Sequence, residues 1–153
     1  MTTNYTGILT DLEDVVRMFF PDYKRGDEDG IACDVFGEQE LLVRVSVGGD
    51  VTERSFFVPQ TTKLERTRLI KRYAKIALYD VFKARTGKVF PWGSLTGIRP
   101  TRLAYMLVDE GVKDVEQTLV REFDVRADLA RTVTKIMQNQ QGMLSDRDRE
   151  AAL

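Results

Sequence analysis

The first apolar pattern along the chain has the period of an α-helix. Apolar side chains recur at the i, i+3, i+4 and i+7 positions, namely Leu12, Val15, Val16 and Phe19. Thr10 and Glu13 have the spacing of a capping box, in which each side chain bonds the backbone amide of the other residue. We therefore expect a helix from about Asp11 to Phe20, which Pro21 ends.

The next pattern alternates between apolar and polar residues, which is typical of β-strands. It covers residues 31–36, with Cys33 on the apolar face, and residues 41–47. A third run over residues 51–58 follows Gly48-Gly49, a pair that suits a tight hairpin turn because glycine tolerates positive φ. These runs predict a three-stranded antiparallel meander.

A long helix is predicted next, over residues 63–86. Thr62 and Glu65 have capping-box spacing at its start, and Gly87 is a suitable left-handed end. Its apolar stripe contains Leu69, Ile70, Tyr73, Ala74, Ala77, Leu78, Val81 and Phe82, while Lys71, Arg72 and Lys75 lie largely off that stripe.

The last third of the chain is predicted to form short helices. Pro100 suits the first turn of a helix that Gly111 ends, and Asp114 can cap a second helix. Asp124 can cap a third, which we expect to end near Gly142. The fold class is therefore α+β: an N-terminal helix and three-stranded antiparallel meander, a long basic helix, and a C-terminal cluster of three short helices.

We expect three regions along the chain. Residues 1–87 form an α+β region, residues 88–142 form an irregular loop and a helical subdomain, and residues 143–153 form a tail. Ser145 begins another helical pattern that reaches Leu153 with no end signal, so we expect the natural protein to continue beyond this residue.

The chain contains one cysteine and no histidine. A single thiol excludes an internal disulfide and any zinc site or iron–sulfur cluster ligated by cysteines of this chain alone. The Ser-His-Asp and Cys-His schemes are excluded as well. Cys33 itself is predicted to be a small core residue. No signal peptide and no apolar run long enough for a bilayer are present, so we expect a cytoplasmic protein with no membrane partner.

A net charge of −1 conceals a strong segregation of charge along the chain. Residues 1–62 carry five basic and twelve acidic side chains, residues 63–102 eleven basic and two acidic, and residues 103–153 seven basic and ten acidic. One interpretation of the +9 segment is a solvated helix neutralised by acidic neighbours. The other is a surface for an anionic ligand, an acidic partner or nucleic acid.

A nucleic-acid-binding module is the alternative function that this segregation supports. It would use residues 63–102 together with the polar face of the last helix, formed by Arg131, Lys135, Gln138, Asn139, Gln140 and Gln141. A sequence pI of about 5.6 and the acidic flanks weaken non-specific attraction to phosphates, so nucleic acid is the less favoured partner.

The segment over residues 90–102 has an unusual composition, with two glycines, two prolines and the lone tryptophan. The free amides and the positive dipole end of a helix that begins at Pro100 can hold an anion, and Arg99 and Arg102 can add bidentate contacts. Alternatively, Trp92 and Leu95 pin the loop to the core and both arginines form salt bridges. The candidates for anion, substrate or domain contact are Trp92, Thr96, Gly97, Arg99 and Arg102.

The twelve residues from Pro91 to Arg102 resemble a PWG-x-LTG-[IV]-RPT-[KR] segment of a radical S-adenosylmethionine family. That family is the oxygen-independent coproporphyrinogen III oxidase-like proteins, or coproporphyrinogen dehydrogenases, in their long form. The likeness covers about residues 60–141 well and the first third of the chain only in outline.

The resemblance implies that this chain is the accessory region preceding a catalytic barrel. In the family, a CxxxCxxC motif in the barrel holds a 4Fe-4S cluster that cleaves S-adenosylmethionine, and the implied activity is oxidative decarboxylation of porphyrinogen propionates in haem biosynthesis. No such motif occurs here, so no catalytic, cofactor or metal residue carries over. We expect a non-enzymatic segment of a longer oxidoreductase, whose partners are its own barrel and a porphyrinogen.

Overall fold

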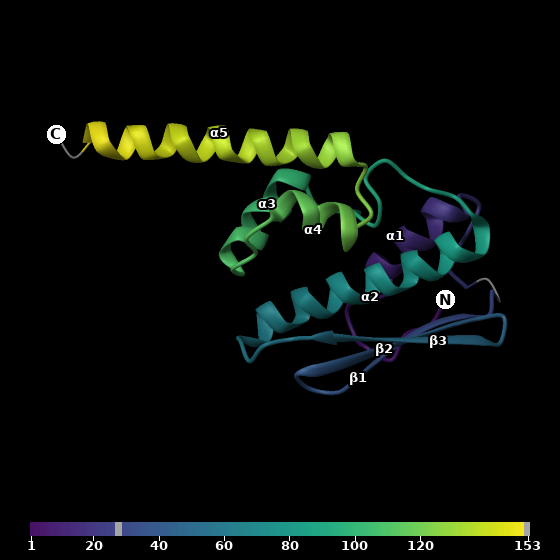
Figure 1. Cartoon of the computed structure of the whole chain (residues 1–153). Coiled ribbons are helices and arrows are strands. Elements are labelled where there is room, and N and C mark those ends of the chain that lie inside the picture. Colours follow the sequence, from purple (N-terminus) through teal and green to yellow (C-terminus); the bar gives the residue numbers. More distant parts are fainter. Residues whose placement is uncertain (27–28, 152–153) are drawn as a thin grey trace. The chain divides into compact units, whose positions relative to one another are not determined.

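The computed structural model describes residues 1–26 and 29–151 of the chain, with side chains described up to residue 142. The described chain forms two compact units, Met1–Val89 and the part that begins at Phe90 (Figure 1). The α+β class and the order of the elements are confirmed.

The first unit is a small sheet covered by two helices. Its elements are α1 (Leu9–Phe19), β1 (Ile31–Phe36), β2 (Glu40–Val47), β3 (Asp50–Phe57) and α2 (Lys63–Thr86). The strands form the predicted antiparallel meander in the order β1-β2-β3. Gly48 and Gly49 form the turn that connects β2 to β3. In Figure 1, α2 runs along one face of the sheet and α1 packs against α2.

The core of this unit lies between the sheet and the two helices. Cys33, Val43 and Val45 are buried on the sheet, and the apolar stripe of α2 covers them. Phe19 of α1 contacts the rings of Tyr79 and Phe82 on α2, each at a centroid distance of 5.4 Å. Cys33 is therefore a core residue, as predicted, and burial together with the nearby charge of Asp34 raises the pKa of its thiol to about 12.

The ends of α2 follow the sequence signals. The Thr62 side chain accepts a hydrogen bond from the Glu65 amide at 3.2 Å, and Gly87 adopts a left-handed conformation with φ of 72°. Both ends are therefore determined by local chemistry.

The predicted capping box of α1 is wrong. The helix begins at Leu9 with Ile8 as its N-cap residue, so Thr10 lies inside the first turn. Glu13 is fully buried and accepts hydrogen bonds from Tyr23 at 3.0 Å and from Nε of Arg25 at 2.9 Å. A carboxylate buried in this way needs charged and polar partners, and these come from the segment after the helix rather than from the helix start.

The second unit is helical and contains α3 (Pro100–Asp109), α4 (Val115–Arg121) and α5 (Ala127–Ala151). Asp114 caps α4 as predicted, because its side chain accepts a hydrogen bond from the Gln117 amide at 3.0 Å. Its core is formed by apolar residues of all three helices and of the segment before α5, namely Leu103, Ala104, Leu107, Val115, Leu119, Phe123, Val125, Ala130, Val133 and Met137.

Three predictions about the last helix are wrong. Asp124 does not cap α5, which begins at Ala127; instead Asp124 has a positive φ of 58° in the connection from α4. The helix also continues through Gly142 to Ala151, so the expected end at Gly142 and the separate start at Ser145 are absent. A single glycine inside a helix costs only about 1 kcal/mol, and the residues around it continue the helix. Leu153 lies outside the described residues.

Among the described residues, none of the helices combines the length and apolar character needed to cross a bilayer.

Candidate functional site

The segment from Pro91 to Arg102 lies in the second unit and divides into two parts with different roles. The first part, Pro91 to Ser94, is a turn that is tied to the connection between α4 and α5. The Ser94 amide donates to the Phe123 carbonyl at 2.9 Å, and the Arg126 amide donates to the Pro91 carbonyl at 2.8 Å. Hydrogen bonds in both directions therefore fix the turn against residues 123–126.

Gly93 and Ser94 are the buried residues of this turn. Gly93 has a φ of 58°, and a Cβ atom placed there would lie 1.9 Å from the Phe123 carbonyl oxygen, so the position admits only glycine. Ser94 is 3% exposed, and its hydroxyl donates to the same carbonyl at 3.3 Å. The sequence pattern does not single out Ser94 or its partner Phe123, because nothing in it links residues this far apart.

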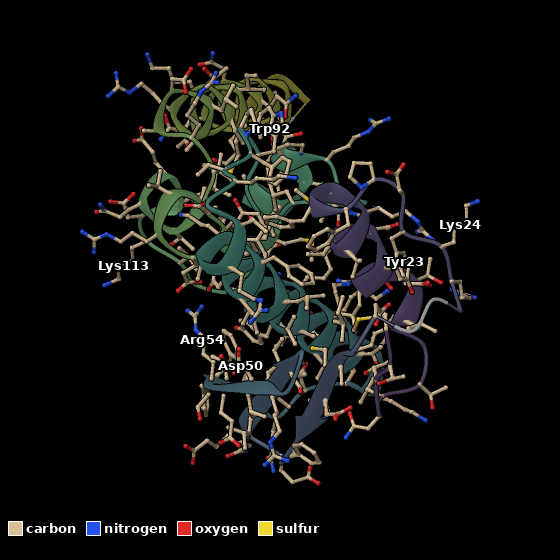
Figure 2. All side chains as sticks on the ribbon, turned by 90° about the vertical axis from the view of Figure 1, so that its right-hand side faces the viewer. Tyr23, Lys24, Asp50, Arg54, Trp92 and Lys113 are labelled. Atoms are coloured by element: carbon tan, nitrogen blue, oxygen red, sulfur yellow. The ribbon has the colours of Figure 1, made fainter. Side chains whose placement is uncertain are left out.

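Trp92 and Leu95, which one alternative expects to pin the loop to the core, are less buried than the two residues between them. Trp92 is 38% exposed and Leu95 is only half-buried, whereas Gly93 and Ser94 form the contacts that fix the turn. The indole ring therefore offers apolar surface on the second unit (Figure 2).

The second part of the segment leads into α3 and carries the two arginines. Gly97 is exposed with a φ of 69°, Thr96 is half-buried, and α3 begins at Pro100 as predicted. Arg99 is the N-cap residue, and its own side chain makes no hydrogen bond to the amides of the first turn. The first amides of a helix have no partner within the helix itself, so they can bind an acceptor from outside it.

Arg99 and Arg102 are both exposed. Within the part of the chain whose side chains are described, neither arginine forms a salt bridge. The expected alternative, in which both side chains are used in salt bridges to acidic neighbours, is not found among these residues. Two guanidinium groups and the positive end of a ten-residue helix therefore stand at one place on the surface.

The basic segment over residues 63–102 has a different character on α2. Lys71 pairs with Asp11 at 3.4 Å, Arg85 pairs with Asp50 at 3.0 Å, and Arg68 pairs with Glu65 at 3.0 Å. Arg66 donates to the backbone carbonyls of Gly37 and Glu38. Acidic residues of the N-terminal third of the chain thus pair with two of the α2 cations, Lys71 and Arg85.

Lys75 illustrates the same arrangement. Its side chain is half-buried, and burial lowers the pKa of its ammonium group, while the charges of Asp11 and Asp14 act in the opposite direction. Lys75 therefore presents less of its charge to a phosphate backbone than a fully exposed lysine would. The pairing on α2 therefore favours the solvated, neutralised helix over a nucleic-acid surface.

The polar face of α5 is also partly used within the chain. Arg131 lies 3.5 Å from Glu116, and the side chain of Gln140 accepts a hydrogen bond from Tyr105 at 2.8 Å. Lys135, Gln138 and Asn139 are exposed.

A 4Fe-4S cluster does not fit this chain, because three thiolates are needed and Cys33 is the sole cysteine and is buried. Among the described residues, no group of three or more cysteine, aspartate or glutamate side chains is placed to hold a metal ion. The cluster that the resemblance implies therefore cannot be ligated by cysteines of this chain alone.

Comparison with known proteins gives a distant and partial similarity. The chain is similar to the oxygen-independent coproporphyrinogen-III oxidase-like protein HemZ of Bacillus subtilis (strain 168), with 32% identity over 75 residues. The similarity is to a coproporphyrinogen oxidase-like protein. The aligned region covers 44% of this chain but only 15% of HemZ, so the chain spans a small part of that relative's length. No family model matches the chain. No solved structure matches it.

Proposed function

We propose that this chain is a non-catalytic accessory region of a radical S-adenosylmethionine oxidoreductase resembling oxygen-independent coproporphyrinogen III oxidase. In this role it packs on the catalytic barrel and helps to bind an anionic tetrapyrrole. The observation that carries the proposal is the exposed pair Arg99 and Arg102 beside the start of α3. The partial similarity to HemZ supports the class of enzyme.

The chemistry of a porphyrinogen matches this surface. Its propionate groups are carboxylates, which accept paired hydrogen bonds from arginine and single hydrogen bonds from helix N-terminal amides. The exposed ring of Trp92 lies in the same segment and offers a flat apolar surface for a macrocycle. The residues of this chain therefore bind and orient the ligand, while the barrel would supply the cluster and the cofactor.

The rigid turn before the arginines supports a positioning role. Ser94 and Gly93 are fixed against Phe123, so the start of α3 is held on a packed scaffold. A binding site on a fixed scaffold loses less conformational entropy when the ligand binds.

The test is a titration with coproporphyrin III, the stable oxidised form of the porphyrinogen. Because Trp92 is the sole tryptophan, quenching of its fluorescence gives a single signal for binding, and the variants below locate the site. The double variant Arg99→Ala/Arg102→Ala should weaken binding at least about tenfold, since two charge-assisted contacts are lost. The wild-type affinity should also fall as salt is added.

A matched control removes the same charge elsewhere on the second unit. Lys113 and Arg121 are exposed, and the double variant Lys113→Ala/Arg121→Ala should keep the wild-type affinity. Equal losses in both double variants would mean that only net charge matters and would refute the site. Tight, salt-dependent binding of duplex DNA with no response to coproporphyrin would instead support the nucleic-acid module.

A further inference from the structure

The two edges of the sheet in the first unit differ in whether another segment covers them. The edge of β1 is covered by the N-terminal segment, since the Cys33 amide donates to the Thr2 carbonyl and the Thr2 amide donates to the Ile31 carbonyl, each at 2.9 Å. The Asn4 side chain completes the cover through two hydrogen bonds to the Val35 backbone. Among the described residues, no strand pairs with the outer edge of β3.

The register shows which peptide groups this open edge presents. The Val58 amide donates to the Gln39 carbonyl at 2.7 Å, and Thr52 lies opposite Val45 in β2. Because hydrogen bonding alternates along an antiparallel strand, even-numbered residues bond to β2. The peptide groups of Val51 and Glu53 therefore point to the open edge, where they can bond another strand.

The side of β3 that faces α2 is open as well. Thr52 and Arg54 are exposed, although their neighbours Val43 and Val45 on the same face of β2 are buried. A cavity of about 220 Å³ lies between β3 and α2, lined in part by Ala77, Val81 and Ala84.

Two ion pairs link β3 to α2 at this cavity. Arg54 pairs with Asp80 at 2.5 Å, and Asp50 pairs with Arg85 at 3.0 Å. Figure 2 labels Asp50 and Arg54, which lie four residues apart along β3. Opposite charges therefore stand two residues before and two residues after Thr52.

We propose that β3 pairs with β3 of a second copy of this chain, antiparallel about a two-fold axis at Thr52. The two sheets then form one continuous sheet. This symmetry places Asp50 of each copy opposite Arg54 of the other. The two ion pairs then join into a row of alternating charge, in which Arg85 and Asp50 of one copy are followed by Arg54 and Asp80 of the other, and the two-fold axis generates a second, identical row. The proposal does not depend on the tetrapyrrole function.

Three other symmetric registers, with the axis at Glu53, Arg54 or Ser55, oppose groups that do not suit each other. An axis at Glu53 sets two glutamates opposite one another, and an axis at Arg54 does the same with two arginines, which destabilises cross-strand pairs. An axis at Ser55 sets the Glu53 carboxylate opposite Phe57. Charge complementarity thus favours a second copy and the register at Thr52.

The first test is sedimentation of the whole chain over a range of concentrations, with variants at Glu53. Glu53→Pro removes an amide that points to the open edge and makes no bond to β2, so it should raise the dimer dissociation constant about tenfold or more. Glu53→Ala is the matched control, because it also loses the Arg44 contact but keeps the amide, and it should dimerise as the wild type does. A monomeric wild type, or a Glu53→Pro dimer of unchanged affinity, would overturn the proposal.

The second test fixes the register by disulfide trapping and does not depend on the folding of a proline variant. Thr52→Cys brings two cysteines to a non-hydrogen-bonded pair with Cα atoms about 4.5 Å apart, within disulfide range. In the same register two copies of Arg54→Cys stand about 13 Å apart and cannot form the bond. Mild oxidation should therefore give a covalent dimer of Thr52→Cys only, with the wild type, which retains buried Cys33, as the blank. Trapping of Arg54→Cys instead, or of neither variant, would refute the register.

Discussion

Gly93 lies against the backbone of Phe123 so closely that a Cβ atom at Gly93 would come within 1.9 Å of the Phe123 carbonyl oxygen. The same carbonyl accepts hydrogen bonds from the amide and the hydroxyl of Ser94. This contact joins the turn before α3 to the connection between α4 and α5, and it therefore sets where the start of α3, with Arg99 and Arg102, is held in the second unit.

We expect Gly93→Ala to destabilise the second unit by at least about 2 kcal/mol, because the methyl group clashes with backbone and the residue has positive φ. Gly97→Ala is the matched control. Gly97 also has positive φ but has open space around it, so the cost should be about 1 kcal/mol. Urea unfolding followed by Trp92 fluorescence measures both values, and equal losses would contradict the tight contact.

Alanine at both Arg99 and Arg102 should leave the free energy of unfolding within about 0.5 kcal/mol of the wild-type value, because both side chains are exposed. The same urea titration checks this expectation. A clear loss of stability together with unchanged coproporphyrin affinity would show that the arginines serve the fold and not a ligand.

The Glu13 cluster makes the stability of the first unit depend on pH. The hydrogen bond from Arg25 holds the pKa of the Glu13 carboxyl below its usual value of 4.5, although burial acts in the opposite direction. A lowered folded-state pKa means that the stabilisation is fully present above 4.5 and is lost as the pH falls through the folded-state pKa.

Glu13→Gln should therefore cost about 2 kcal/mol at neutral pH, and the difference from the wild type should shrink as the pH falls from about 5 to 3. Thermal or urea unfolding followed by circular dichroism over this range measures the difference. A difference that stays constant with pH would contradict the charged cluster.

Thr62 and Thr10 provide a matched test of helix capping. Thr62→Ala should destabilise the first unit by about 1 kcal/mol, because the Glu65 amide loses its acceptor. Thr10→Ala should cost only about 0.5 kcal/mol, because Thr10 lies inside α1 and caps nothing, and the hydrogen bond that its hydroxyl accepts from Arg25 at 3.2 Å is solvent-exposed. Equal costs for the two variants would restore the capping box at the start of α1.

Cys33 should resist thiol reagents while the chain is folded. Its pKa of about 12 leaves almost no thiolate at pH 8, and the side chain is fully buried. A chromogenic disulfide reagent should therefore react only after urea is added, at the rate of unfolding. Rapid reaction of the folded chain would show that the strand opens locally.

The sequence by itself determined the features that depend on neighbouring residues. Strand alternation, the Gly48-Gly49 turn, the Thr62 cap and the start of α3 at Pro100 are all read from short windows, and the structure has them as expected. The single cysteine by itself excludes a metal centre ligated by several cysteines of this chain alone. In the candidate site, Arg99 and Arg102 were singled out from the sequence because their residue types and their place at the start of a helix are local features, whereas their exposure required the structure.

Only the tertiary structure decided which partner each of several polar groups has. Glu13 has capping-box spacing, yet its carboxylate accepts hydrogen bonds from Arg25 and Tyr23. A buried charge is stabilised more by a charged partner than by a helix amide. Contacts between distant segments decide two further features, namely the acidic partners of the basic helix and the contact of Gly93 with Phe123. They also decide which edge of the sheet stays uncovered among the described residues, which is that of β3. Local periodicity carries no information about such pairs, since they depend on where the packed helices and strands bring the backbone.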